Sequence, residues 1–179
     1  MNIPNFLTIL RILSIPLFII LLSYGFYPLA LLLFFCAGVT DALDGFLART
    51  FKQKTTLGAY LDPIADKLLL SSSFVAFSIL KLMPVWLTIL VISRDVIILG
   101  GILVLLVNSF SISINPTIIS KCTTTLQLLT IGLTLLFQVM QNKYIPLHLV
   151  YWITGLFTII SGIDYVRRGI RLINERERN

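Results

Sequence analysis

Six apolar stretches, each about as long as a bilayer is thick, follow one another along this 179-residue chain. They cover approximately residues 4–24, 27–49, 60–80, 84–107, 117–139 and 146–170. A helix that crosses a bilayer needs about 20 mostly apolar residues. Few residues remain outside the stretches, and only 12% of the chain is charged, against about a quarter in soluble domains. The sequence therefore predicts an all-α integral membrane protein with six transmembrane helices, folded as a single domain over residues 1–179.

The distribution of lysine and arginine predicts how these helices are oriented. Arg49, Lys52 and Lys54 lie between the second and third stretches, whereas the connections on the other side carry only Lys81 and Lys143. Arginines also gather at the end of the chain, at positions 167, 168, 171, 176 and 178. Because positive residues favour the cytoplasmic side, both termini are predicted to be cytoplasmic. The first stretch is predicted to be a transmembrane helix and not a cleaved signal peptide. The membrane is predicted to be a bacterial plasma membrane.

Charge and cysteine content argue against a nucleic-acid site, a disulfide and a metal site built from cysteines. The formal net charge of +6 is spread over helix ends and the tail, which favours contact with anionic lipid over a nucleic-acid partner. Cys36 and Cys122 lie far apart within apolar stretches. They are predicted to be inert, buried thiols and neither a disulfide nor a metal site.

Four aspartates stand out in this apolar chain: Asp41, Asp44, Asp62 and Asp66. An Asp at the centre of a membrane helix costs roughly 2.5–3.5 kcal/mol, so such residues usually have a function. Residues three or four apart share a helix face, which makes two carboxylate pairs, one on each side of a short connection. Four converging carboxylates would repel one another unless cations neutralised them. The pattern predicts a polar, metal-lined cavity on the cytoplasmic side, suited to Mg²⁺ or Mn²⁺.

Two such cations could bridge a diphosphate, which favours phosphoryl transfer at a membrane surface. Two alternatives remain. The acids could form ion pairs with Arg49, Lys52, Lys54 and Lys67 at helix ends, although that does not require two same-face pairs. They could instead form the ion site of a cation transporter, although such sites lie nearer the bilayer midplane.

The segment DALDGFLARTFKQKTTLGAYLDPIADK has the pattern D-x2-D-G-x2-A-R-x8-G-x3-D-x3-D. It resembles the signature of the CDP-alcohol phosphatidyltransferase family at all eight fixed positions. The segments NIPNFLTILRI, ISRDV and ISKCTTTLQ are similar to members that make phosphatidylglycerophosphate, and the last two also to members that make cardiolipin. The resemblance implies an enzyme of phospholipid biosynthesis that transfers a phosphatidyl group from CDP-diacylglycerol to glycerol 3-phosphate and releases CMP. Phosphatidylglycerol is the alternative acceptor.

The resemblance also assigns roles to the signature residues. It implies two divalent cations, Mg²⁺ or Mn²⁺, with Asp41, Asp44 and Asp62 as ligands and Asp66 as both ligand and catalytic base. Gly45, Ala48 and Arg49 match positions near the nucleotide and diphosphate of CDP-diacylglycerol. The family also implies a homodimer.

Two polar residues of the first stretch extend this predicted substrate site. Asn5 and Thr8 recur at three-residue spacing where that stretch enters from the cytoplasmic side. They are predicted to line the nucleotide pocket, with helix capping or interface anchoring as the alternative.

An anionic acceptor requires cations outside the signature. Arg94 and Lys121 are predicted to bind it, and Arg167 or Arg168 are further candidates. Arg94 lies within an apolar stretch, where a charge without a partner is disfavoured. Its alternative role is a structural pair with a neighbouring acid, although helical geometry argues against Asp95, since adjacent residues point to different faces. For Lys121 the alternative is snorkelling to the interface.

One further ion pair is predicted in the last stretch. Asp164 lies three and four residues before Arg167 and Arg168. At that spacing the carboxylate can reach either guanidinium along one helix face.

Overall fold

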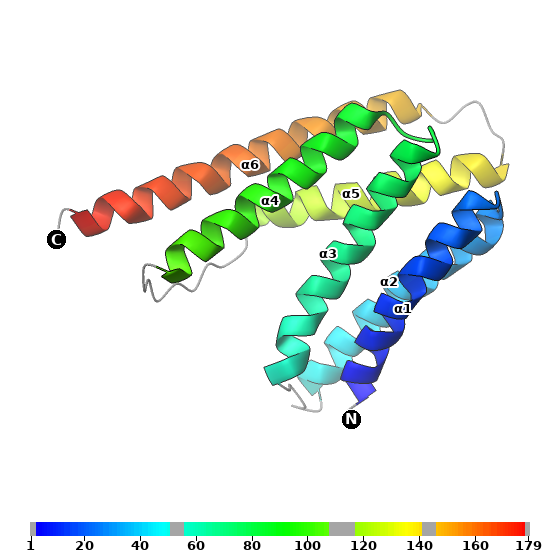
Figure 1. Cartoon of the computed structure of the whole chain (residues 1–179), viewed down its shortest axis with the longest axis horizontal. Helices are drawn as coiled ribbons and strands as arrows, with labels where there is room; N and C mark the ends of the chain where they lie inside the picture. Colours follow the sequence, from blue (N-terminus) through cyan, green and yellow to red (C-terminus); the bar gives the residue numbers. More distant parts are fainter. Residues whose placement is uncertain (1–2, 51–55, 108–116, 141–145, 178–179) are drawn as a thin grey trace. The chain divides into compact units, whose positions relative to one another are not determined.

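The computed structural model describes residues 3–50, 56–107, 117–140 and 146–177, and the side chains of residues 9–40, 65, 67–101, 117–140 and 146–171. Six helices account for the described backbone (Figure 1): α1 Ile3–Ser23, α2 Tyr27–Thr50, α3 Thr56–Ile79, α4 Val85–Val107, α5 Ile118–Met140 and α6 Leu147–Glu177. No strand occurs within these ranges. The all-helical prediction is confirmed for the described part of the chain.

The helix boundaries follow the predicted ranges closely, with two differences. Helix α3 begins at Thr56 and not at residue 60, and α6 continues to Glu177, beyond residue 170. The predicted ranges ended where the sequence ceases to be apolar. A helix needs only its backbone hydrogen bonds to continue, so residues 171–177, which are rich in Arg and Glu and have good helix propensity, extend α6 past its apolar part.

The helices form two compact units. Unit 1 comprises Met1–Met83 with Ile131–Ile145, and unit 2 comprises Pro84–Thr130 with Pro146–Asn179. In unit 1, α1 packs against both α2 and α3. Phe18 of α1 anchors this packing, with ring centroids 6.0 Å from Phe34 of α2 and 6.3 Å from Phe77 of α3. Tilted aromatic pairs at this separation add to the apolar burial.

In unit 2, α4 packs against α6. Trp86 of α4 and Trp152 of α6 contact each other, with ring centroids 4.9 Å apart. Trp86 also lies against the backbone of Gly155, where an added Cβ atom would come within 2.7 Å of the Trp86 ring atom Cζ3. The missing side chain at Gly155 thus lets the indole reach the α6 backbone.

Many large apolar side chains are exposed and many polar side chains are buried, unlike in a typical water-soluble protein. Large apolar side chains such as Leu13, Phe35, Ile79 and Ile118 are 64–80% exposed. The buried side chains of the described part include many polar ones: Arg11, Ser73, Thr88, Arg94, Asp95, Thr117, Thr123, Gln127, Thr130, Thr134, Thr154, Thr158 and Ser161. Extended apolar surface of this kind marks contact with lipid or another apolar partner.

Two helical segments of the described chain, Ile118–Met140 and Leu147–Arg171, are long and apolar enough to cross a membrane. Together with the exposed apolar surface they point to a membrane protein. The same surface corrects the prediction for the cysteines. Cys36 and Cys122 are free, as predicted, but both are exposed and not buried, because they lie on outer helix faces.

Two helices end in the same hydrogen-bonded turn. After α1, Gly25 (φ 76°) donates to the Leu22 carbonyl and Phe26 to the Leu21 carbonyl. After α3, Lys81 (φ 58°) and Leu82 repeat this pattern with Ser78 and Phe77. Both are Schellman motifs, in which the left-handed position favours glycine. Lys81 therefore occupies a strained backbone conformation.

We expect Lys81→Gly to stabilise the protein by about 0.5–1 kcal/mol, because the left-handed conformation costs a residue with a Cβ atom about 1–2 kcal/mol and glycine almost nothing. Thermal unfolding in detergent would measure the gain. Lys81→Ala is the matched control, since it removes the charge and keeps the Cβ atom. An equal gain from Lys81→Ala would contradict the backbone explanation.

We expect Gly155→Ala to destabilise the α4–α6 packing by about 1–3 kcal/mol, the usual cost of overpacking a well-filled contact. Gly169→Ala on the same helix is the control, because a Cβ atom there meets nothing within 4 Å. Adding Trp86→Phe to Gly155→Ala should restore part of the loss in thermal unfolding. Full stability of Gly155→Ala alone would show that the indole moves away freely.

Candidate functional site

The signature residues occupy helix ends that gather at one end of unit 1. The beginning of α1, the end of α2 and the beginning of α3 lie together at the end marked N in Figure 1. Asn5 and Thr8 belong to the first turns of α1, and Gly45, Ala48 and Arg49 to the last turns of α2. The fold therefore brings the backbones of the predicted substrate residues to the same end of the unit. Their side chains lie outside the described residues.

The four aspartates lie at similar distances along their helices from the ends of α2 and α3 that face each other in sequence. Asp41 and Asp44 are nine and six residues before the end of α2 at Thr50, and Asp62 and Asp66 are six and ten residues after the start of α3 at Thr56. With a rise of about 1.5 Å per residue, both pairs are about 9–15 Å from the helix ends that the short connection joins. The two pairs are thus at comparable distances, counted along the helices, from the connection.

This donor set fits hard divalent cations. Each pair spans one helical turn, so its two carboxylates can share a face, and carboxylate oxygen is the ligand that Mg²⁺ and Mn²⁺ prefer. The four side chains are outside the described part of the chain, so their role as ligands stays a prediction. Among the side chains that are described, no group of three or more His, Cys, Asp or Glu residues could hold a metal ion.

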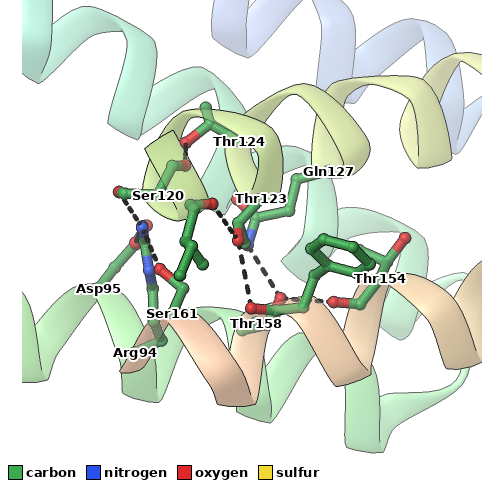
Figure 2. Close-up of polar contacts among 11 residues, drawn as sticks. Arg94, Asp95, Ser120, Thr123, Thr124, Gln127, Thr154, Thr158 and Ser161 are labelled. Carbon is green, nitrogen blue, oxygen red and sulfur yellow. Dashed lines mark hydrogen bonds and ion pairs between the residues drawn. The ribbon is translucent and has the colours of Figure 1, made fainter. Parts of the chain in front are cut away.

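A second polar group lies in unit 2, and we call Arg94, Asp95, Ser120 and Ser161 the Arg94 cluster (Figure 2). Arg94 is only 3% exposed. Its Nη1 donates to Asp95 Oδ1 at 2.7 Å, and its Nη2 donates to Ser120 Oγ at 2.6 Å and to Ser161 Oγ at 3.1 Å. One guanidinium on α4 thus joins the start of α5 to the middle of α6.

The pairing of Arg94 with Asp95 contradicts the sequence analysis, which excluded Asp95 as a partner. The prediction was wrong because it considered only the directions in which adjacent Cβ atoms leave the helix. The three methylene groups of arginine are long enough for the guanidinium to fold back towards the next residue. The ion pair is buried, with both side chains less than 10% exposed, so each charge offsets the desolvation cost of the other.

The Arg94 cluster continues into a row of hydrogen bonds between α5 and α6, which we call the polar seam (Figure 2). Thr130 and Thr154 hydroxyls are 2.7 Å apart, Gln127 Nε2 donates to Thr158 Oγ1 at 3.3 Å, and Thr123 Oγ1 donates to the Phe157 carbonyl at 3.2 Å. Such contacts hold apolar helices together where lipid offers no polar partner.

The polar seam and the two serines of the Arg94 cluster were not predicted from the sequence. The signal was a three- and four-residue spacing of small polar side chains within apolar stretches. It occurs at Ser120, Thr123, Gln127 and Thr130 on α5, and at Thr154, Thr158 and Ser161 on α6. Composition alone hides it, because serine and threonine are only weakly polar.

The remaining predicted residues of unit 2 behave differently from Arg94. Lys121 is exposed, whereas its neighbour Ser120 on α5 faces Arg94 inside the unit. Arg167 is also exposed. Asp164 Oδ2 accepts a hydrogen bond from Arg168 Nε at 3.1 Å, which confirms the predicted pair at four-residue spacing. Neither Lys121 nor Arg167 is brought into the Arg94 cluster.

A match to the family described as CDP-alcohol phosphatidyltransferase covers residues 1–160. The chain belongs to this family. The matched range includes the whole signature from Asp41 to Asp66, and it contains Arg94 and Lys121. The family predicted from the signature is therefore confirmed.

Three relatives illustrate the similarity. A probable phosphatidylglycerophosphate synthase of Mycobacterium tuberculosis is 34% identical over 177 residues, which is 95% of this chain and 82% of the relative. The CDP-diacylglycerol–glycerol-3-phosphate 3-phosphatidyltransferase of Haemophilus influenzae is 37% identical over 93% of this chain and 92% of its own. A probable CMP-forming cardiolipin synthase of Drosophila melanogaster is 35% identical over 93% of this chain and 57% of its own.

Proposed function

We propose that this protein transfers a phosphatidyl group from CDP-diacylglycerol to glycerol 3-phosphate, giving phosphatidylglycerophosphate and CMP. The observation that carries the proposal is the complete family signature on α2 and α3, with one aspartate pair on each of these consecutive helices. Similarity over nearly the full length to the Haemophilus enzyme, whose name states this reaction, supports the choice of acceptor.

In this proposal the aspartates form a centre for two divalent cations, Mg²⁺ or Mn²⁺. When bound, the cations would offset the negative charge of the diphosphate and of the transition state. Asp41, Asp44 and Asp62 serve as ligands, and Asp66 serves as both ligand and base. The cytidine and diphosphate end of the donor lies against the polar and small residues near them: Asn5, Thr8, Gly45, Ala48 and Arg49.

The reaction forms one phosphorus–oxygen bond and breaks another. The acceptor hydroxyl oxygen attacks the phosphorus that carries the diacylglycerol, and the bond from this phosphorus to the CMP oxygen breaks. Asp66 takes the proton of the acceptor hydroxyl. A carboxylate is a weak base for an alcohol, so the transfer requires that the hydroxyl becomes more acidic as the new bond forms.

The phosphate of the acceptor is assigned to Arg94 and Lys121. Arg94 is a buried cation held by partners from its own helix and from two others, as expected of a side chain that must keep one geometry. Guanidinium groups form strong, charge-assisted hydrogen bonds to phosphate oxygens. Lys121 is exposed, so its ammonium group is accessible to an incoming anion.

The proposed setting is a bacterial plasma membrane. The single domain of residues 1–179 would cross it six times, with both termini and a polar, metal-lined cavity on the cytoplasmic side, and would form a homodimer. The exposed apolar side chains and the two long apolar helices support membrane insertion. The excess of lysine and arginine on one side of the chain supports the orientation.

Cardiolipin synthesis, with phosphatidylglycerol as acceptor, is the second candidate. Similarity to the Drosophila cardiolipin synthase favours it. The two reactions share the donor and the released CMP, and they differ in whether the acceptor is a small phosphomonoester or a lipid.

We expect the purified protein in detergent, with Mn²⁺ and labelled CDP-diacylglycerol, to release CMP when glycerol 3-phosphate is added and not without an acceptor. A chelator should abolish the release and added Mn²⁺ should restore it, because four carboxylates alone repel the diphosphate. Release with phosphatidylglycerol alone would replace the first candidate by the second. Metal flux into vesicles without CMP release under any condition would favour a transporter.

We expect Asp66→Asn to lower turnover by roughly 10²-fold or more, the usual contribution of a positioned general base, while thermal unfolding stays close to that of the unchanged protein. Asp164→Asn is the matched control, because it makes the same chemical change at a carboxylate paired with Arg168. Turnover of Asp66→Asn equal to that of the control would remove the assignment of Asp66 as the base.

A further inference from the structure

We propose that Ser120 and Ser161 are positioning residues for acceptor recognition, which act by fixing the Arg94 guanidinium between three helices. Both hydroxyls accept from the same nitrogen, Nη2, at 2.6 and 3.1 Å, one from α5 and one from α6. The inference rests on the proposed function, in which Arg94 meets the phosphate of the acceptor. The family match ends at residue 160 and so does not include Ser161.

The hydrogen bonds of Arg94 leave two donors for a ligand. A guanidinium carries five N–H groups, and the structure uses three of them, on Asp95, Ser120 and Ser161. Nε is buried and has no hydrogen-bond partner among the described residues. A buried donor without an acceptor costs free energy, so one that persists in a folded protein is a candidate ligand contact. The N–H of Nε and one N–H of Nη1 therefore remain. These two bonds point in different directions, so a phosphate oxygen can accept from either one, but a single phosphate cannot bridge both as a fork.

The two serines restrict the rotation of the Arg94 guanidinium. An arginine side chain has several rotatable bonds, and a single ion pair to the adjacent residue still allows the guanidinium to turn. The two hydroxyls remove this freedom because they hold Nη2 from two different helices. The stem of the arginine lies close to α6 at Gly162, where an added Cβ atom would be at an ordinary van der Waals distance of 3.8 Å from Arg94 Cγ.

Because the Arg94 cluster has no net charge, anion binding depends on the fixed orientation of the guanidinium. The Arg94–Asp95 pair is electrically neutral overall, so it attracts a distant anion only weakly. Its attraction comes from an N–H group held in a fixed direction, as in other sites where preorganised donors bind an anion. Neutral serine hydroxyls can fix those donors without adding charge. A second carboxylate in their place would repel the phosphate.

The test compares Ser120→Ala, Ser161→Ala and the double variant with Arg94→Ala. Because a hydrogen bond to a charged group is among the stronger ones in proteins, each serine change should raise KM for glycerol 3-phosphate by about fivefold or more. The double variant should approach Arg94→Ala. The KM for CDP-diacylglycerol should stay within about twofold, because the proposed function assigns the donor to other residues. A twofold change corresponds to RT ln 2, which is smaller than the free energy of one such hydrogen bond.

Two control variants separate the hydroxyl from the helix. Thr125→Ala removes an exposed hydroxyl of α5 that, among the described residues, donates to the Lys121 carbonyl of its own helix, and it should leave both KM values unchanged. Ser120→Thr keeps the hydroxyl and should remain near the unchanged protein. Equal losses for both substrates in the serine variants, or an unchanged KM for glycerol 3-phosphate, would overturn the inference.

A binding measurement distinguishes failure of this inference from failure of the proposed function. Glycerol 3-phosphate, added with Mn²⁺, should raise the thermal unfolding temperature of the unchanged protein and of Thr125→Ala, and should raise that of the double serine variant much less. If this difference appears without acceptor-dependent CMP release, the proposed reaction is wrong and the positioning role stands. If glycerol 3-phosphate stabilises no variant, or stabilises all of them equally, the positioning role is wrong.

Discussion

Hydrogen bonds between polar side chains in apolar surroundings are the interaction on which unit 2 depends. Its helices expose large apolar side chains and bury threonine, serine, glutamine and arginine. Where the surroundings are as apolar as a leucine side chain, apolar contacts give helices little reason to prefer one another. Each buried polar group must instead find its partner within the protein. The Thr130–Thr154, Gln127–Thr158 and Thr123–Phe157 contacts provide these partners between α5 and α6.

Arg94 extends the same principle from neutral groups to a charge. A guanidinium in an apolar interior requires a counter-ion and gains from acceptors for its other N–H groups. Asp95 is the counter-ion, and Ser120 and Ser161 accept from the two N–H groups of Nη2. Because these partners come from α4, α5 and α6, satisfying one side chain also fixes the relative position of three helices. A residue proposed to bind substrate thus contributes to the packing of the unit that holds it.

Much of the fold could be predicted from the sequence because the length of an apolar stretch constrains a helix strongly. Five of the six predicted stretches begin within one residue of the observed helices, and the sixth, α3, begins four residues earlier than predicted. The family was equally accessible to prediction, since its signature is local in sequence. Predictions that concerned partners or exposure were less accurate. The exclusion of Asp95 and the expected burial of Cys36 and Cys122 were wrong, because each inferred a three-dimensional contact from helix position alone.

The sequence by itself determined the helices, the two aspartate pairs beside one connection, and the family to which the chain belongs, because each of these depends on residue type and spacing along the chain. Only the tertiary structure decided which side chains satisfy Arg94 and which residues join α5 to α6. Ser120 and Ser161 are separated by 41 positions in sequence, and no local pattern connects either of them to Arg94. Their common role exists only because packing of the helices in unit 2 brings both hydroxyls within hydrogen-bond distance of one nitrogen.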